Sequence, residues 1–194
     1  MVTIDHNEIP DFLSAVAVDV GSIVVKSAVK IAMLLFVRRS ELINAEWSEI
    51  DLGNAVWTIP WQRMKMGRKV ANPDKTDHII PLPVQAVETL KALHCVTGRG
   101  RYVFSTGHRL KDAPLGATTI RNFFIRCGYY GKMTVHGFRP LATSWLDKQG
   151  YNRQAIERQL AHKEKGAINQ AYHRADYMDE RREAYPLATV PITG

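Results

Sequence analysis

A short strand-rich region interrupts a chain whose other apolar residues recur at helical spacing. Three segments, at residues 47–52, 55–60 and 78–82, are short and rich in β-branched or aromatic residues, which is typical of strands. Gly53 and Asn54 form a turn signal between the first two segments. We therefore expect an α+β fold that is mostly helical and contains a small antiparallel three-stranded sheet.

The helical pattern is clearest just before this region, where apolar residues recur at helix spacing and predict a helix central to the core. These residues are Ala28, Ile31, Ala32 and Leu35. An earlier helix is expected from residue 9 to about residue 21, and helices are expected from residue 84 almost to residue 186. Because 194 residues suit one domain, we expect a single domain over residues 1–194 with its core at about residues 9–185.

The charge balance favours a polyanionic partner. The chain has 26 Lys and Arg against 19 Asp and Glu, a formal charge of +7. Taken alone this is a weak signal for nucleic acid, since many basic proteins never bind it. Residues 63–77 form a polar stretch that Gly67 and Pro73 predict to be an exposed loop or extended hairpin. Its cations, which could bind DNA phosphates, are Arg63, Lys65, Arg68, Lys69 and Lys75.

Other classes of protein are disfavoured by the sequence. The longest apolar stretch, residues 31–37, is too short to cross a bilayer, so we expect a cytoplasmic protein without a membrane partner. Cys95 and Cys127 lie far apart without a CxxC pattern, and the acidic residues are scattered. A metal-dependent nuclease would need clustered carboxylates, so we expect no metal site.

The segment from His136 to Arg139 is the most informative for chemistry. A helix beginning there would place an apolar stripe on one face and both of these residues on the other. The stripe comprises Phe138, Leu141, Ala142, Trp145 and Leu146. Three residues apart on a helix, an imidazole and a guanidinium could reach one anion. The alternative is an ordinary solvated helix start, because a His-x-x-Arg pattern often arises by chance.

Four short motifs, taken together, change this balance. Arg38-Arg-Ser-Glu41-Leu42, His136-Gly-Phe-Arg139, Leu160-Ala-His162 and Ala171-Tyr172 occur in this order. With Glu46-Trp-Ser-Glu-Ile-Asp-Leu52, Trp57-Thr-Ile-Pro60 and Arg63-Met-Lys-Met66, they resemble the catalytic domain of the tyrosine recombinase (phage integrase) family, most of all phage and genomic-island integrases. The resemblance covers most of residues 9–182 and implies a site-specific recombinase that cleaves and rejoins DNA through a 3′-phosphotyrosyl link.

The resemblance implies a role for each matching residue. Arg38 and Arg139 would stabilise the growing charge on the phosphate, with Glu41 holding Arg38 in place. Lys65 would protonate the departing 5′ oxygen, with Lys69 as the alternative. His136 would accept a proton or donate to the phosphate, and His162 would donate to a non-bridging oxygen.

Tyr172 would be the nucleophile, with Tyr177 and Tyr185 as competitors of lower rank. Ile168, Ala171, Tyr172 and Ala175 also have the spacing of a core helix face, and periodicity alone would favour that interpretation. A tyrosine hydroxyl, with a pKa of about 10, needs nearby cations to become a nucleophile.

The resemblance also implies partners. These are double-stranded DNA attachment sites, a tetramer assembled on DNA in the full-length protein, and accessory DNA-bending or directionality proteins. No cofactor would be needed. We expect these residues to be a catalytic domain without the DNA-clamping domain that precedes it in the family. The alternative is a degenerate module of the same fold that binds DNA but does not cleave it.

Overall fold

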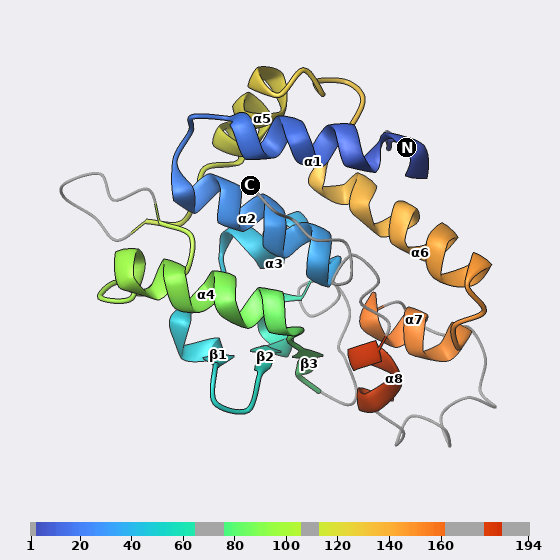
Figure 1. Cartoon of the computed structure of the whole chain (residues 1–194). Coiled ribbons are helices and arrows are strands. Elements are labelled where there is room, and N and C mark those ends of the chain that lie inside the picture. Colours follow the sequence, from blue (N-terminus) through green and yellow to red (C-terminus); the bar gives the residue numbers. More distant parts are fainter. Residues whose placement is uncertain (1–2, 65–75, 106–112, 162–176, 184–194) are drawn as a thin grey trace.

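The computed structural model describes residues 3–64, 76–105, 113–161 and 177–183. Within these ranges the protein is mostly helical with one small sheet, as the sequence predicts (Figure 1). The helices are α1 (Ile9–Val18), α2 (Ile23–Leu35), α3 (Arg39–Ile43), α4 (Val84–Thr97), α5 (Ala117–Arg126), α6 (Phe138–Lys148), α7 (Arg153–Gln159) and α8 (Met178–Glu183). Short 3₁₀ helices are η1 (His6–Glu8), η2 (Trp47–Glu49), η3 (Trp61–Arg63) and η4 (Val135–Gly137).

Helix α2 lies at the centre of the fold, as its periodicity predicts. It begins at the N-cap Ser22, whose hydroxyl accepts a hydrogen bond from the amide of Val24. Its residues Ala28, Ile31 and Ala32 are fully buried, so the helix is apolar on nearly every side. Helix α4 packs along one side of α2 and α5 along another (Figure 1). The end of α2 is therefore fixed deep inside the molecule.

The three strands form an antiparallel sheet in the order β1 (Ile50–Asp51), β2 (Val56–Ile59) and β3 (His78–Pro81). Trp57 pairs with Ile80, and both side chains are buried on the face that packs on the core. His78 lies two residues before Ile80 and is buried on the same face. The prediction of a strand from residue 47 was wrong for its first half, because residues 47–49 form η2, in which Glu49 accepts a hydrogen bond from the amide of Glu46.

The last described element, α8, lies against the sheet and α7. Figure 1 shows α8 below α7 and beside β3, and residue contacts join it to both. Across the described part of the chain, no helix has the length and apolar character needed to span a membrane.

Candidate active site

Arg38 is held firmly at the start of α3. Its Nη1 donates to Glu41 Oε1 at 2.9 Å, and its backbone amide donates to Glu41 Oε2 at 2.9 Å. The Glu41 side chain is only 2% exposed, whereas that of Arg38 is 17% exposed. A buried carboxylate that accepts both hydrogen bonds restricts the rotamers of Arg38. The ion pair expected from the sequence is thus present.

Arg139 lies in the first turn of α6 and is buried, with 4% of its surface exposed. Its Nη1 donates to the carbonyl of Phe36 at 2.7 Å, and its Nη2 donates to the carbonyl of Leu160 at 2.6 Å. The prediction that Arg139 shares an outward face with His136 was therefore wrong. The reason is tertiary: the start of α6 packs against the ends of α2 and α7, whose terminal carbonyls attract a cation.

Arg38 and Arg139 meet at the end of α7. Arg38 Nη2 donates to the carbonyl of Ala161 at 2.9 Å, next to the Leu160 carbonyl that Arg139 uses. Burial and, to a smaller extent, the nearby charge of Arg38 together lower the pKa of Arg139 to about 10. Arg139 nevertheless remains protonated at neutral pH. Two guanidinium groups that repel each other, offset by the one carboxylate of Glu41, form a centre that favours an anion.

The backbone is strained where it meets these arginines. Phe36 and Ala161 have φ angles of 56° and 47°, in the left-handed region that few residues other than glycine adopt. The carbonyl of Phe36 accepts from Arg139, and that of Ala161 accepts from Arg38. Such strain persists only where surrounding contacts hold it, and it is common at functional sites. The two left-handed residues thus mark the ends of α2 and α7 as a built site for the two arginines.

His136 lies in η4, directly before α6, rather than in the helix itself. The hydroxyl of Thr134 accepts a hydrogen bond from the amide of Gly137 and fixes this turn. The His136 side chain is exposed, unlike that of Arg139 three residues later. The turn therefore separates the two residues of the motif into an exposed imidazole and a buried guanidinium.

Arg63 is ion-paired and does not lie in the exposed loop that the sequence predicts. It ends η3, and its Nη2 contacts Glu49 Oε2 at 2.6 Å while its Nη1 donates to the carbonyl of Asn44. Glu49 also accepts a hydrogen bond from Trp57 Nε1 at 3.1 Å. Burial raises the pKa of Glu49, which the charge of Arg63 and the Trp57 hydrogen bond oppose. Arg63 therefore neutralises a carboxylate whose side chain is only 6% exposed, and its role in DNA binding stays a prediction.

Several predicted site residues lie outside the described ranges. They are Lys65, Arg68, Lys69, Lys75, His162, Tyr172 and Tyr185. The competing Tyr177 is described, and its hydroxyl donates to Gln154 Oε1 at 2.6 Å. Among the residues that the structure describes, no three His, Cys, Asp or Glu side chains gather as metal ligands would.

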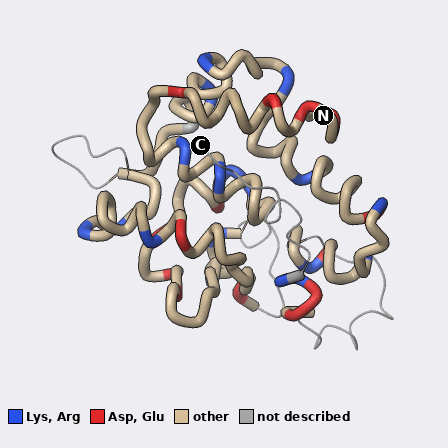
Figure 2. The backbone as a smooth tube through the Cα atoms, in the orientation of Figure 1, with Lys and Arg blue, Asp and Glu red and all other residues tan. Residues whose placement is uncertain are grey.

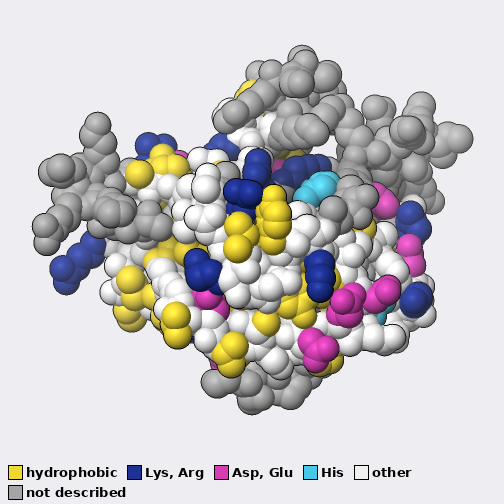
Figure 3. Space-filling model, turned by 90° about the horizontal axis from the view of Figure 1, so that it is seen from above, with side chains coloured by type: hydrophobic (Ala, Val, Ile, Leu, Met, Phe, Trp, Pro, Cys, Tyr) yellow, Lys and Arg dark blue, Asp and Glu magenta, His cyan; other side chains and the backbone are white. Residues whose placement is uncertain are grey.

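Positive charge is spread over the molecule. Figure 2 shows Lys and Arg positions on helices throughout the described ranges. Figure 3 shows basic side chains across the middle of the face seen from above, with acidic side chains gathered toward one side. Such a surface suits phosphate contacts that do not depend on base sequence.

Sequence reasoning missed a cluster of buried polar residues formed by His78, Gln159 and Arg181. None of them belongs to a motif, and Arg181 stands in a charged run that reads as a solvated helix. No local signal in the sequence could have revealed their burial, because each partner comes from a different element.

The mostly helical fold, the small antiparallel sheet and the two neighbouring arginines are the features that the sequence resemblance to phage integrases predicts. The chain matches the Phage integrase family over residues 3–178, and it belongs to that family. It is 35% identical over 185 residues to the integrase of Enterobacteria phage P4, covering 89% of this chain and 41% of that protein. It is 33% identical over 178 residues to the integrase of Shigella phage Sf6, covering 91% of this chain and 44% of that protein.

Solved structures show the same fold at lower identity. The lambda integrase catalytic core has a TM-score of 0.58 at 18% identity, covering 84% of this chain and 96% of that one. The XerA recombinase has a TM-score of 0.62 at 22% identity, covering 97% of this chain and 64% of that one. The chain spans less than half the length of the phage integrases that it matches.

Proposed function

We propose that residues 1–194 form the catalytic domain of a site-specific DNA recombinase that integrates or excises a mobile element. Tyr172 is the proposed nucleophile. The observation that carries the proposal is the convergence of Arg38 and Arg139 on the carbonyls of Ala161 and Leu160. His162, a further candidate, follows Ala161 directly in the sequence.

The arginine pair suits phosphoryl transfer. A DNA phosphodiester carries a negative charge that becomes more concentrated on its non-bridging oxygens in the pentacoordinate transition state. Cations that are already fixed by Glu41 and by backbone carbonyls need little reorganisation when that charge develops. Arg38, which keeps some exposure, would contact the phosphate, and the positive charge of the buried Arg139 would add to the stabilisation.

The proposed reaction has two transesterification steps, cleavage and rejoining. The Tyr172 oxygen attacks phosphorus, a Tyr–O–P bond forms, and the bond from phosphorus to the 5′ oxygen breaks. That oxygen takes a proton from Lys65 or Lys69, His136 either accepts the tyrosine proton or donates to the phosphate, and His162 donates to a non-bridging oxygen. The tyrosine proton passes to His136 or, where His136 donates to the phosphate, to solvent. In the second step a 5′-hydroxyl of the partner strand attacks the phosphotyrosine phosphorus and gives its proton to the neutral lysine. A bond from phosphorus to that 5′ oxygen forms, the Tyr–O–P bond breaks, and the tyrosine oxygen takes back a proton.

The proposed partner is double-stranded DNA carrying an attachment site. Related structures include a lambda integrase dimer bound to a core site and a lambda integrase tetramer bound to a Holliday junction. We extend this to a tetramer on DNA for the full-length protein, aided by accessory DNA-bending or directionality proteins and acting in the cytoplasm. Arg63, Arg68, Lys69 and Lys75 are the proposed DNA-binding cations, and Arg63 also pairs with Glu49.

Covalent trapping tests this proposal. The parent protein, Tyr172→Phe and Tyr177→Phe are incubated with nicked suicide duplexes carrying the attachment site, and denaturing gels are scored for a protein–DNA adduct. We expect adducts from the parent and from Tyr177→Phe, and none from Tyr172→Phe, which lacks only the hydroxyl. Duplex binding without an adduct from any of the three would favour the alternative of a DNA-binding module that has lost cleavage.

A further inference from the structure

Arg181 is a buried cation in a helix that its sequence predicts to be exposed. Only 1% of its surface is accessible, although it stands among Asp179, Glu180 and Arg182 in α8. Its Nε donates to Gln159 Oε1 at 3.0 Å, and its Nη2 donates to the carbonyl of Ile79 in β3. The guanidinium thus bridges the end of α7 and a strand of the sheet.

The bridge continues through Gln159 into the core. Gln159 Nε2 donates to the carbonyl of Leu35 at 3.0 Å, and the Gln159 carbonyl lies 3.2 Å from His78 Nε2, which can donate to it. His78, Gln159 and Arg181 are all buried, and we name these three residues the anchor cluster. The anchor cluster ties together β3, α7, α8 and the end of α2.

Burying the guanidinium of Arg181 costs free energy. Removing a guanidinium from water carries a large desolvation penalty, which the hydrogen bonds to Gln159 and Ile79 help to offset. An apolar side chain of similar size could fill the same space. What the apolar side chain could not do is hold three elements in one defined geometry through directional hydrogen bonds.

The anchor cluster lies next to the carbonyls that bind the two arginines. Gln159 stands three residues before His162, Arg181 stands nine residues after Tyr172, and His78 opens the strand that follows the stretch containing Lys65. Leu160 and Ala161, next to Gln159, supply the carbonyls that bind Arg139 and Arg38. The anchor cluster therefore fixes the end of α7 to which the two arginines bind.

We propose that Arg181 is a positioning residue for DNA cleavage, a role that rests on the proposed function. By fixing α8 to α7 and β3, it holds the end of α7, whose carbonyls bind Arg139 and Arg38, in the geometry that cleavage needs. It does not touch the DNA itself. Small displacements of reacting groups are sufficient to lower the rate of a chemical step by large factors.

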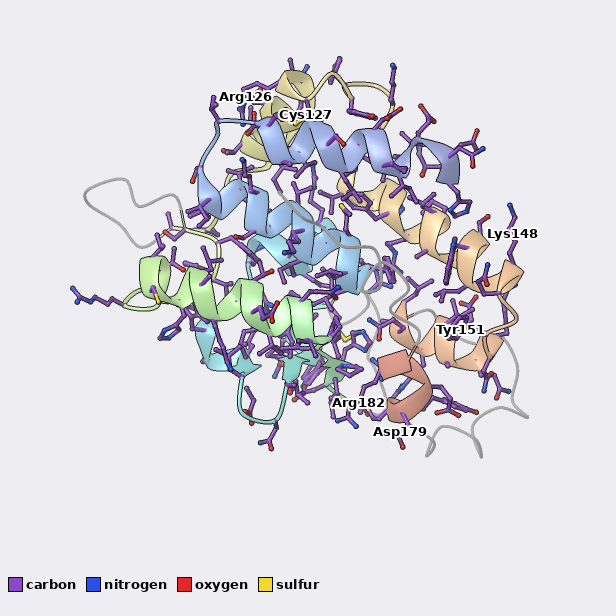
Figure 4. The ribbon with its side chains drawn as sticks, viewed as in Figure 1. Arg126, Cys127, Lys148, Tyr151, Asp179 and Arg182 are labelled. Carbon is purple, nitrogen blue, oxygen red and sulfur yellow. The ribbon has the colours of Figure 1, made fainter. Side chains whose placement is uncertain are left out.

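The neighbouring Arg182 provides a matched control. It belongs to the same helix and carries the same charge, but it is 51% exposed and pairs with the exposed Asp179 at 3.2 Å. Figure 4 labels Arg182 and Asp179 on α8. Arg181→Met and Arg182→Met remove the same charge from α8, so any shared change in DNA affinity reflects charge alone. Leu90→Ala, in the buried face of α4, provides a second control that loses stability without removing any group of the anchor cluster.

The experiment measures binding, cleavage and local order separately. Apparent Kd is measured by gel shift on intact duplex, and the single-turnover rate of adduct formation is measured on nicked suicide duplex at saturating protein. All proteins are assayed at a temperature at which thermal melts show them folded. Hydrogen exchange of the α8 amides, read by mass spectrometry, reports the anchoring without any cleavage.

We expect Arg181→Met to cleave about 10-fold to 100-fold more slowly than Arg182→Met at equal DNA occupancy, with faster exchange in α8. Arg181→Lys, which can reach only one of the two acceptors, should recover part of the rate. Equal cleavage by Arg181→Met and Leu90→Ala would overturn the positioning role, since general destabilisation would then explain the loss. Unchanged α8 exchange would overturn the anchoring. If the parent protein binds DNA without forming an adduct, the proposed function is wrong. Hydrogen exchange of α8 would still test whether Arg181 anchors this helix.

Discussion

His78 should make the stability of the fold depend on pH in a defined window. Burial lowers the pKa of this histidine to about 3, and the charges of Arg181, Arg158 and Arg38 lower it in the same direction. In the unfolded chain the pKa returns to about 6.5. Between these two values the unfolded state binds a proton that the folded state does not bind, so acidification favours unfolding.

The magnitude follows from linkage. Well below pH 6.5 and above pH 3, one proton changes stability by about 1.4 kcal/mol for each pH unit. Between about pH 7.5 and about pH 5, the contribution of His78 to the free energy of unfolding should therefore fall by about 2 kcal/mol. The stability is fully present above pH 6.5 and decreases as the pH is lowered.

Urea unfolding followed by circular dichroism at several pH values measures this directly. The control is His78→Gln, which keeps a hydrogen-bond donor for the Gln159 carbonyl but does not titrate. Every other titrating group, including His6, is common to both proteins and cancels in the difference. We expect the parent to lose about 2 kcal/mol more than the variant between about pH 7.5 and about pH 5. Parallel stability curves for the two proteins would refute the reasoning.

Two further substitutions test the ion pairs of the site. Glu41→Gln should reduce the rate of adduct formation by about 10-fold and the free energy of unfolding by about 1–3 kcal/mol, because Arg38 loses its charged partner. Single-turnover cleavage and urea unfolding measure the two effects. An unchanged rate would show that Arg38 does not need Glu41 for cleavage. Arg63→Met should lower the free energy of unfolding by about 3 kcal/mol, because the carboxylate of Glu49 loses its cationic partner, and it should reduce the slope of log K against log salt by about 1, because a proposed phosphate contact is lost. Urea unfolding and gel shifts measure the two effects, and an unchanged slope would restrict Arg63 to its structural pairing with Glu49.

Much of the fold could be predicted from the sequence because it depends on local patterns. The spacing of Ala28, Ile31 and Leu35 identifies the central helix, and Gly53-Asn54 marks the turn between β1 and β2. The first strand was the exception. Residues from Trp47 have strand-like composition, yet η2 forms there because side-chain hydrogen bonds of Glu49 stabilise a tight turn.

The environment of the candidate site could not be predicted in the same way. Arg139 finds its acceptors at Phe36 and Leu160, 103 and 21 residues away, so periodicity alone placed it on the wrong face of α6. Arg181 is similar, since its acceptors on Gln159 and Ile79 are 22 and 102 residues away. Long-range carbonyl acceptors leave no trace in the local sequence, whereas the Arg38–Glu41 pair, three residues apart, does.

The central claim is that Tyr172 becomes covalently linked to DNA, and peptide mapping tests it most directly. Trypsin cuts after Lys165, Arg174 and Arg181, so Tyr172 falls in residues 166–174 and Tyr177 in residues 175–181. The adduct trapped on nicked suicide duplex is digested with nuclease and trypsin, and the peptide that retains a nucleotide is identified by mass spectrometry. We expect the nucleotide on residues 166–174, at Tyr172. A nucleotide on residues 175–181, or on any other peptide, would contradict the assignment.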